Sequence, residues 1–219
     1  MVQEIELSIP TSWEDITLKK YLSFRDDMKN YEDDEVAVTA TMLYHLCGLD
    51  PTYLNSLAVA DYALIRNELS KFINNTDLGL QRFITIDGVE YGFEPNLSQM
   101  AYGAYADITQ YKQLTIDENW PKIMNILYRP VVKKQGDNYS IKAYTGDNKY
   151  DKWLDVGMDK HFGCLFFFVY LSTDLLKNTL NSLMGKDMTP DINSILALSG
   201  KAIQQFTNLQ KEISQSTIS

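Results

Sequence analysis

The sequence predicts a mainly α protein with a small β-hairpin component, an α+β fold. It places a single helical domain over residues 1–186 and a C-terminal amphipathic helix and tail over 187–219. Most segments space their apolar residues three or four positions apart, as in helices with one buried face. Asp87-Gly88 joins two short β-prone runs, the signature of a tight hairpin. Of 219 residues, 45% are hydrophobic and 22% charged, which is typical of a globular chain with its own core.

The first two helices have recognisable ends. Thr17 can cap a helix that runs to Met28, because its hydroxyl can accept a backbone N–H left unpaired in the first turn. A second helix is predicted from Val36 to Cys47, with Gly48 as a suitable stop. The acidic run of residues 32–35 precedes it, where negative charge is favourable at the positive end of the helix dipole. A cation site is the alternative interpretation of that run.

The middle of the chain alternates helical and β signals. Asp-Pro at residues 50–51 is typical of a helix start, since Asp caps and Pro suits the first helical position. The hairpin is predicted near residues 82–93, because β-prone residues flank its turn. The predicted helices of this region run over Val59–Ile73, Leu97–Leu114 and Trp120–Tyr128, the last ended by Pro130.

The stretch near residues 131–152 is polar and rich in turns. Gly-Asp-Asn occurs in it twice, at Gly136 and Gly146. It is predicted to form one or two short strands with exposed turns, a mobile flap. Tyr139 and Tyr144 lie in it and are candidate partner-binding residues, because loop tyrosines offer contact area with few rotors. The alternative is that such tyrosines cover the protein's own core.

Two helices are predicted in the C-terminal part. The first runs over 159–184 and contains the apolar run Phe162–Leu171, which is predicted to be nearly fully buried. The second runs from Asp191 to Ile213 and is amphipathic, so it is either a docking element or folds back on its own domain. The candidate partner-binding residues on its apolar stripe are Ile192, Ile195, Leu196, Ile203, Phe206 and Leu209.

Charge and composition exclude several kinds of partner. The formal net charge of -9 argues against nucleic acid and against anionic membranes, which both need a basic surface. The longest apolar run, Phe162–Leu171, is about half the ~20 residues of a membrane-spanning helix. The N-terminus has no basic, then apolar, signal-peptide pattern, and the two cysteines are typical of reduced core residues. The chain is therefore expected to be made in the cytoplasm and to bind proteins.

No convincing metal, cofactor or catalytic site is predicted. His45, Cys47, His161 and Cys164 make a tetrahedral zinc set by count, but His-x-Cys in one helix turns its two side chains about 200° apart. The Asp147–Asp151 stretch lacks most positions of a calcium loop and favours a surface turn. Glycine-rich phosphate loops and hydrolase motifs are missing. The sequence therefore predicts no cofactor, no metal and no enzymatic activity.

Several short sequence segments, here called phrases, resemble segments of a known group of proteins. They are Ile9–Tyr21, the hairpin followed by Leu97-Ser98, Ile126–Val131 and Gly163–Phe168. In this order they resemble proteins from the tail and virion region of tailed bacteriophages, especially crAss-like and related phages of gut bacteria. The phrases span about three quarters of the chain and end before Gly185. The resemblance supplies no functional residues.

The resemblance implies a non-enzymatic, virion-associated structural or packaged protein of the capsid interior or tail. Its partners would be other phage structural proteins, with the chain in many copies or homo-oligomeric, and its final location the virion after synthesis in the host cytoplasm. The alternative is a tail-assembly chaperone that is absent from the mature particle. A phage enzyme with a scattered carboxylate site and a helical inhibitor of host proteins are further alternatives.

Overall fold

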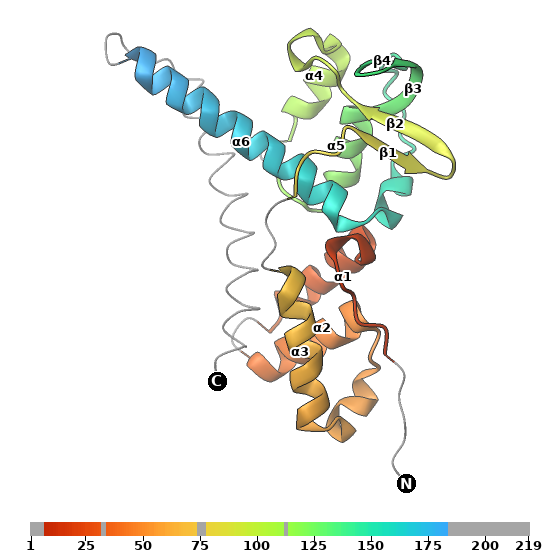
Figure 1. The fold of residues 1–219 in the computed structure, drawn as a ribbon, viewed down its shortest axis with the longest axis vertical. Coiled ribbons are helices and arrows are strands. Elements are labelled where there is room, and N and C mark those ends of the chain that lie inside the picture. Colours follow the sequence, from red (N-terminus) through yellow and green to blue (C-terminus); the bar gives the residue numbers. More distant parts are fainter. Residues whose placement is uncertain (1–6, 32–33, 74–77, 112–113, 184–219) are drawn as a thin grey trace. The chain divides into compact units, whose positions relative to one another are not determined.

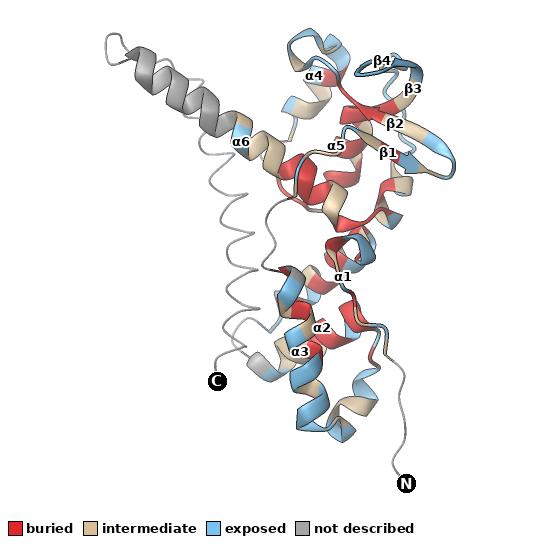
Figure 2. Cartoon of the chain, viewed as in Figure 1, coloured by how far each residue is buried: buried red, intermediate tan, exposed pale blue. Residues whose placement is uncertain are grey.

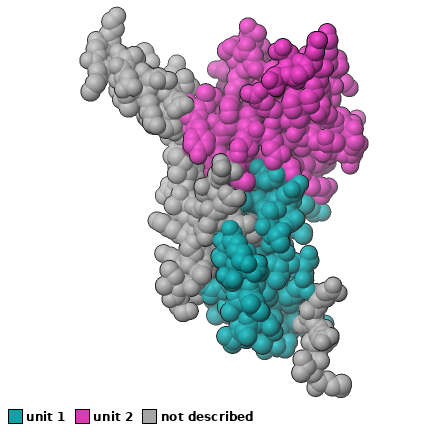
Figure 3. All heavy atoms as spheres, viewed as in Figure 1, with its two compact units in different colours: residues 1–77, 157–159, 207–219 teal, residues 78–156, 160–206 magenta. Residues whose placement is uncertain are grey.

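The fold is α+β, as the sequence predicts. The computed structural model describes residues 7–31, 34–73, 78–111 and 114–183, and the side chains of the last helix as far as Leu171. The chain divides into two compact units (Figure 3). In the described residues, unit 1 holds 7–73 and 157–159, and unit 2 holds 78–156 and 160–183. That residues 1–186 behave as one domain stays a prediction.

Unit 1 is built from helices whose ends follow local chemistry (Figure 1). Thr17 caps α1, its side chain accepting from the backbone N–H of Lys20 as predicted. Asp34 caps α2, accepting from two backbone N–H groups at 3.0 Å, which favours the helix-dipole interpretation of the acidic run. Gly48 ends α2 in the left-handed region with φ 73. The elements are η1 (Trp13–Asp15), α1 (Leu18–Met28), α2 (Glu35–Cys47), η2 (Pro51–Ser56) and α3 (Val59–Ile73).

Residues 157–159, which lie far along the chain, also belong to unit 1. Thr17 and Gly157 form an isolated antiparallel bridge, and the Met158 N–H donates to the Ile16 carbonyl at 2.8 Å. A Cβ at Gly157 would lie 2.5 Å from the carbonyl oxygen of Glu14, so only glycine fits this approach. The buried apolar side chains of the unit come from η1, α1, α2, α3 and the segments that join them (Figure 2), among them Trp13, Ile16, Leu18, Phe24, Leu43, Leu49, Ile65, Leu69 and Ile73.

Unit 2 contains a four-stranded antiparallel sheet in the order β1-β2-β3-β4. Its strands are β1 (Phe83–Ile86), β2 (Val89–Phe93), β3 (Tyr128–Gln135) and β4 (Asn138–Ile141). Asp87 and Gly88 join β1 to β2 with φ values of 51 and 75, so the predicted tight hairpin is confirmed. Gly136, with φ 59, turns β3 into β4. The short strands predicted near 131–152 are present as β4 and most of β3, but they form part of the sheet and not a separate flap.

The helices of unit 2 differ from the prediction in two places. The predicted helix over Leu97–Leu114 is a 3-10 turn, η3 (Leu97–Gln99), followed by α4 (Tyr102–Thr109). Met100 and Ala101 adopt extended ψ values of 142 and 137, which separates the two. The second helix, α5 (Trp120–Leu127), ends one residue early, since Tyr128 already belongs to β3. Pro130 disfavours the helical region for the residue before it and so favours the strand.

The last described helix, α6 (Met158–Leu183), is buried over less of its length than the sequence predicts. Residues 161–165 are buried, whereas residues 166–169 are half-buried and Tyr170 is 68% exposed (Figure 2). The expectation that Phe162–Leu171 is nearly fully buried is therefore wrong from residue 166 onward. An apolar side chain is suited to burial, but whether it is buried depends on which other elements of the fold pack against it.

Candidate binding groove

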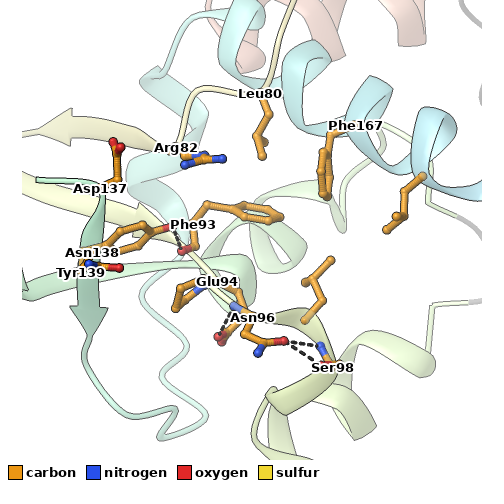
Figure 4. A pocket seen from close by; sticks show the side chains of 13 residues that line it. Leu80, Arg82, Phe93, Glu94, Asn96, Ser98, Asp137, Asn138, Tyr139 and Phe167 are labelled. Carbon is orange, nitrogen blue, oxygen red and sulfur yellow. Dashed lines mark hydrogen bonds between the residues drawn. The ribbon is translucent and has the colours of Figure 1, made fainter.

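A groove of about 500 Å³ lies in unit 2, between the sheet and α6 (Figure 4). Four segments line it: the chain before β1, the end of β2 with the turn into η3, the β3–β4 turn, and α6. Its lining residues are Leu80, Arg82, Phe93, Glu94, Pro95, Asn96, Leu97, Ser98, Asp137, Asn138, Tyr139, Phe167 and Leu171.

One wall of the groove is apolar. The rings of Phe93 and Phe167 meet edge to face, with their centroids 5.4 Å apart. Phe93 is buried, whereas Phe167 is only half-buried, as are Leu80, Leu97 and Leu171. Completing the burial of such a side chain contributes on the order of 1 kcal/mol. This wall can therefore bind another apolar side chain.

The other wall is polar and fixed by hydrogen bonds. The Tyr139 hydroxyl donates to the backbone carbonyl of Phe93 at 2.7 Å. The Asn96 side-chain oxygen accepts from the backbone N–H of Ser98 at 3.1 Å and from its hydroxyl at 2.7 Å (Figure 4). These bonds hold the turn after β2 in a defined shape, so the groove is largely preformed.

Two glycines allow the backbone to approach closely around the groove. A Cβ at Gly92 would lie 2.9 Å from Cε2 of Tyr139, so the Tyr139 ring can lie over the strand only because residue 92 is glycine. A Cβ at Gly163 would lie 2.5 Å from the carbonyl oxygen of Gly79. The second approach brings the chain before β1 against α6, where Leu80 reaches the groove.

A buried ion pair lies beside the groove. Glu94 and Arg129 are 8% and 9% exposed, and Arg129 Nη2 donates to Glu94 Oε2. The Arg129 Nε has no hydrogen-bond partner among the described residues. Burying two charges is costly unless they are paired, so each holds the other in place. Glu94 is therefore committed to a structural contact and is a poor candidate for acid–base chemistry.

A second hollow, of about 330 Å³, lies under the segment that follows β4. The Lys152 ammonium donates to the side-chain oxygen of Asn125, and the Asn125 amide donates to the Asp147 carbonyl at 2.9 Å. Burial lowers the pKa of Lys152 from its ordinary value. These bonds tie the second half of the predicted flap to α5, so a ligand would have to displace existing contacts.

The predicted partner-binding tyrosines both make internal contacts. Tyr139 lines the groove and packs edge to face on Phe83, with ring centroids 4.7 Å apart. Tyr144 is half-buried and donates its hydroxyl to the Asp107 carboxylate. Burial and this hydrogen bond raise the pKa of Tyr144 to about 12. Their contact with a partner stays a prediction. The other candidates, Ile192, Ile195, Leu196, Ile203, Phe206 and Leu209, lie outside the described residues.

The four candidate zinc ligands have other surroundings. His45 Nε2 lies 2.6 Å from Asp27 Oδ2, in unit 1. Burial raises the pKa of Cys47 to about 11 and raises the pKa of Cys164 further above its usual range. Within the described part of the chain, no group of three or more His, Cys, Asp or Glu side chains could hold a metal ion.

His161 belongs to a buried network. The Trp120 indole N–H donates to its Nδ1 at 3.1 Å, so that nitrogen is an acceptor and the proton is on Nε2. Nε2 then donates to the Trp153 carbonyl at 3.2 Å. All three residues are 0% exposed, and burial lowers the pKa of His161 to about 3. The ring is therefore a neutral part of the core and has no access to a substrate.

Sequence reasoning did not identify the groove. Leu80, Leu97 and Phe167 come from segments 87 residues apart at the extremes, and only the fold brings them together. One signal was available: the apolar run of α6 is longer than the stretch that the core buries. Where a helix stays apolar beyond the residues that the core buries, the remaining apolar side chains are a candidate binding surface.

No family model matches the chain, and comparisons with curated proteins and with solved structures find no match either. Among the described helices, none is long and apolar enough to cross a membrane.

Proposed function

We propose that this chain is a non-enzymatic, virion-associated protein of a tailed bacteriophage, present in many copies in the capsid or tail. It acts by binding other phage structural proteins. The observation that carries the binding role is the groove of unit 2, which has a half-buried apolar wall and a fixed polar wall. Such a lining recognises an apolar side chain and orients the polar groups beside it. The phage setting comes from the sequence resemblance.

The charges of the groove favour binding over catalysis. Glu94 is paired with Arg129, and Arg82 and Asp137 are exposed to solvent. General acid–base catalysis needs titratable groups held beside the reacting atoms with pKa values near the working pH. The lining supplies no such pair of groups in the described residues, so a protein partner suits it better than a substrate.

Exposed tyrosines give a second contact surface in the same unit. Tyr102 and Tyr105 lie three residues apart on α4 and are 83% and 57% exposed. Residues three apart share one face of a helix, so the two rings can contact one partner. Tyrosine is enriched in protein interfaces because its ring adds area and its hydroxyl stays hydrated.

The experiment is quantitative mass spectrometry of purified particles from a phage that encodes this chain. The expected result is several copies per particle. Presence in the infected lysate with absence from the particle would overturn the virion assignment in favour of a tail-assembly chaperone.

A paired substitution tests the groove in the same experiment. Leu97→Asp places a charge on the half-buried apolar wall, whereas Gln99→Asp places it at an exposed position of the same turn. Leu97→Asp should reduce incorporation about tenfold, the effect of ~1.4 kcal/mol of lost binding. Gln99→Asp should leave incorporation unchanged. Equal effects of the two substitutions would show that the groove is not the binding site.

A further inference from the structure

The groove has the features of a site for an amphipathic helix. Its apolar wall runs along α6 from Phe167 to Leu171, one helical turn of about 6 Å. Its polar wall includes the amide side chains of Asn96 and Asn138, which suit neutral polar partners. A helix that presents an apolar stripe flanked by amides and hydroxyls would satisfy both walls.

One segment of this chain has that pattern. The sequence predicts an amphipathic helix over residues 191–213, and these residues lie outside the described part of the structure. Its stripe includes Ile195, Ile203 and Phe206, and the flanking positions are mainly Gln, Asn and Ser. Between residues 192 and 206 the only charged side chain is Lys201. Such a segment is far more neutral than the chain as a whole, whose net charge is -9.

The length of the chain allows this segment to reach the groove of its own molecule. From Leu171 in the groove wall to Leu183 at the end of α6 there are twelve residues, or about 18 Å of helix. Residues 184–190 then supply a seven-residue connection that spans up to about 23–25 Å when extended. The connection is therefore long enough to bring residue 191 back to the level of the groove.

We propose that residues 191–206 of the chain dock their apolar stripe into the groove of the same molecule. A tethered segment has an effective concentration in the millimolar range, which favours it over a free segment of similar sequence. The inference rests on the groove being a binding site, as the proposed function does, and it names the occupant. A phage partner of the groove then has to displace this segment.

The test is photo-cross-linking within the full-length chain, in the absence of any phage protein. Phe206 is replaced by the photoreactive amino acid p-benzoylphenylalanine, and the products are mapped by mass spectrometry. The expected products join position 206 to the groove peptides that contain residues 93–98, 137–139 or 167–171. The matched control carries the same amino acid at Gln204, which lies inside the proposed docked segment and about 200° around the helix from position 206.

The stripe position should give about tenfold more groove product than the control, the ratio that ~1.4 kcal/mol of preference for one face produces. The reaction is run on a mixture of unlabelled and ¹⁵N-labelled chains. Products joining a light to a heavy chain would overturn the proposal and make a second copy the occupant. Products that miss the groove, or equal yields from both positions, would overturn it altogether. The mass spectrometry of particles tests the proposed function independently, since it does not depend on what covers the groove.

Discussion

Replacing Gly163 by Ala should destabilise unit 2, because α6 approaches the chain before β1 too closely for a methyl group. The added Cβ would lie 2.5 Å from the Gly79 carbonyl oxygen and 3.2 Å from its carbon. Ordinary contact begins near 3.4 Å, so the two backbones must separate by about 0.9 Å. The obstacle is backbone, which cannot rotate away as a side chain can.

The magnitude follows from two opposing effects. Overpacking of a closely packed site costs about 1–3 kcal/mol, and the value belongs in the upper half of that range because backbone must move. Replacing a glycine inside a helix by alanine returns about 1 kcal/mol through helix propensity. The net expectation is a loss of about 1–2 kcal/mol in the free energy of unfolding.

The assay is urea denaturation followed by tryptophan fluorescence. The third tryptophan, Trp13, lies in unit 1 and is replaced by Phe in every protein compared. Trp120 and Trp153 are both fully buried in unit 2, so the remaining emission reports its unfolding. Gly79→Ala is the matched control, because a Cβ at Gly79 meets no atom within 4 Å and should change stability by less than about 1 kcal/mol. A Gly163→Ala protein as stable as the wild type, or more stable, would show that this close approach does not exist.

Three further predictions concern the buried groups of unit 2. Burial lowers the pKa of His161 to about 3 in the folded protein, against about 6.5 in the unfolded chain. The free energy of unfolding should therefore fall by about 1.4 kcal/mol per pH unit as the pH drops below about 6.5, because the unfolded chain then takes up a proton that the folded protein does not. Denaturation midpoints at pH 7, 6 and 5 measure this loss. Gly92→Ala should cost about 1–3 kcal/mol through its clash with Tyr139, and less in a Tyr139→Ala background, as a double-mutant cycle would show. Arg129→Met should cost about 3–5 kcal/mol because it leaves Glu94 buried and unpaired, and adding Glu94→Leu should restore most of the loss in thermal unfolding.

The features that the sequence predicts correctly are those decided within a few residues. Thr17 caps α1 and Gly48 ends α2, because the unpaired backbone groups of a helix end are satisfied by the nearest side chain or turn. The hairpin at Asp87 and Gly88 follows from the positive φ values that its turn demands. The type and position of these elements could therefore be read without the fold.

The features that the sequence does not predict depend on residues distant in the chain. β3 pairs with β2 through residues 128–130, across more than 30 residues, and the end of a predicted helix gives no local sign of that pairing. The predicted helix from Leu97 does begin there, capped by Asn96, but the extended backbone at Met100 and Ala101 ends it after one 3-10 turn. The groove combines both difficulties, because its walls come from four separate segments.

The same contact determines the stability of unit 2 and the shape of its groove. The approach that Gly163 permits holds residue 79 against α6, and Leu80, the next residue, lines the groove. A substitution that pushes this chain away from α6 therefore changes the apolar wall as well as the free energy of unfolding. Lost partner binding in Gly163→Ala would not show that Gly163 touches a partner. The substitution Leu97→Asp tests partner binding apart from this backbone contact. Leu97 lines the groove from the turn after β2, and it is not part of the close approach between Gly79 and Gly163.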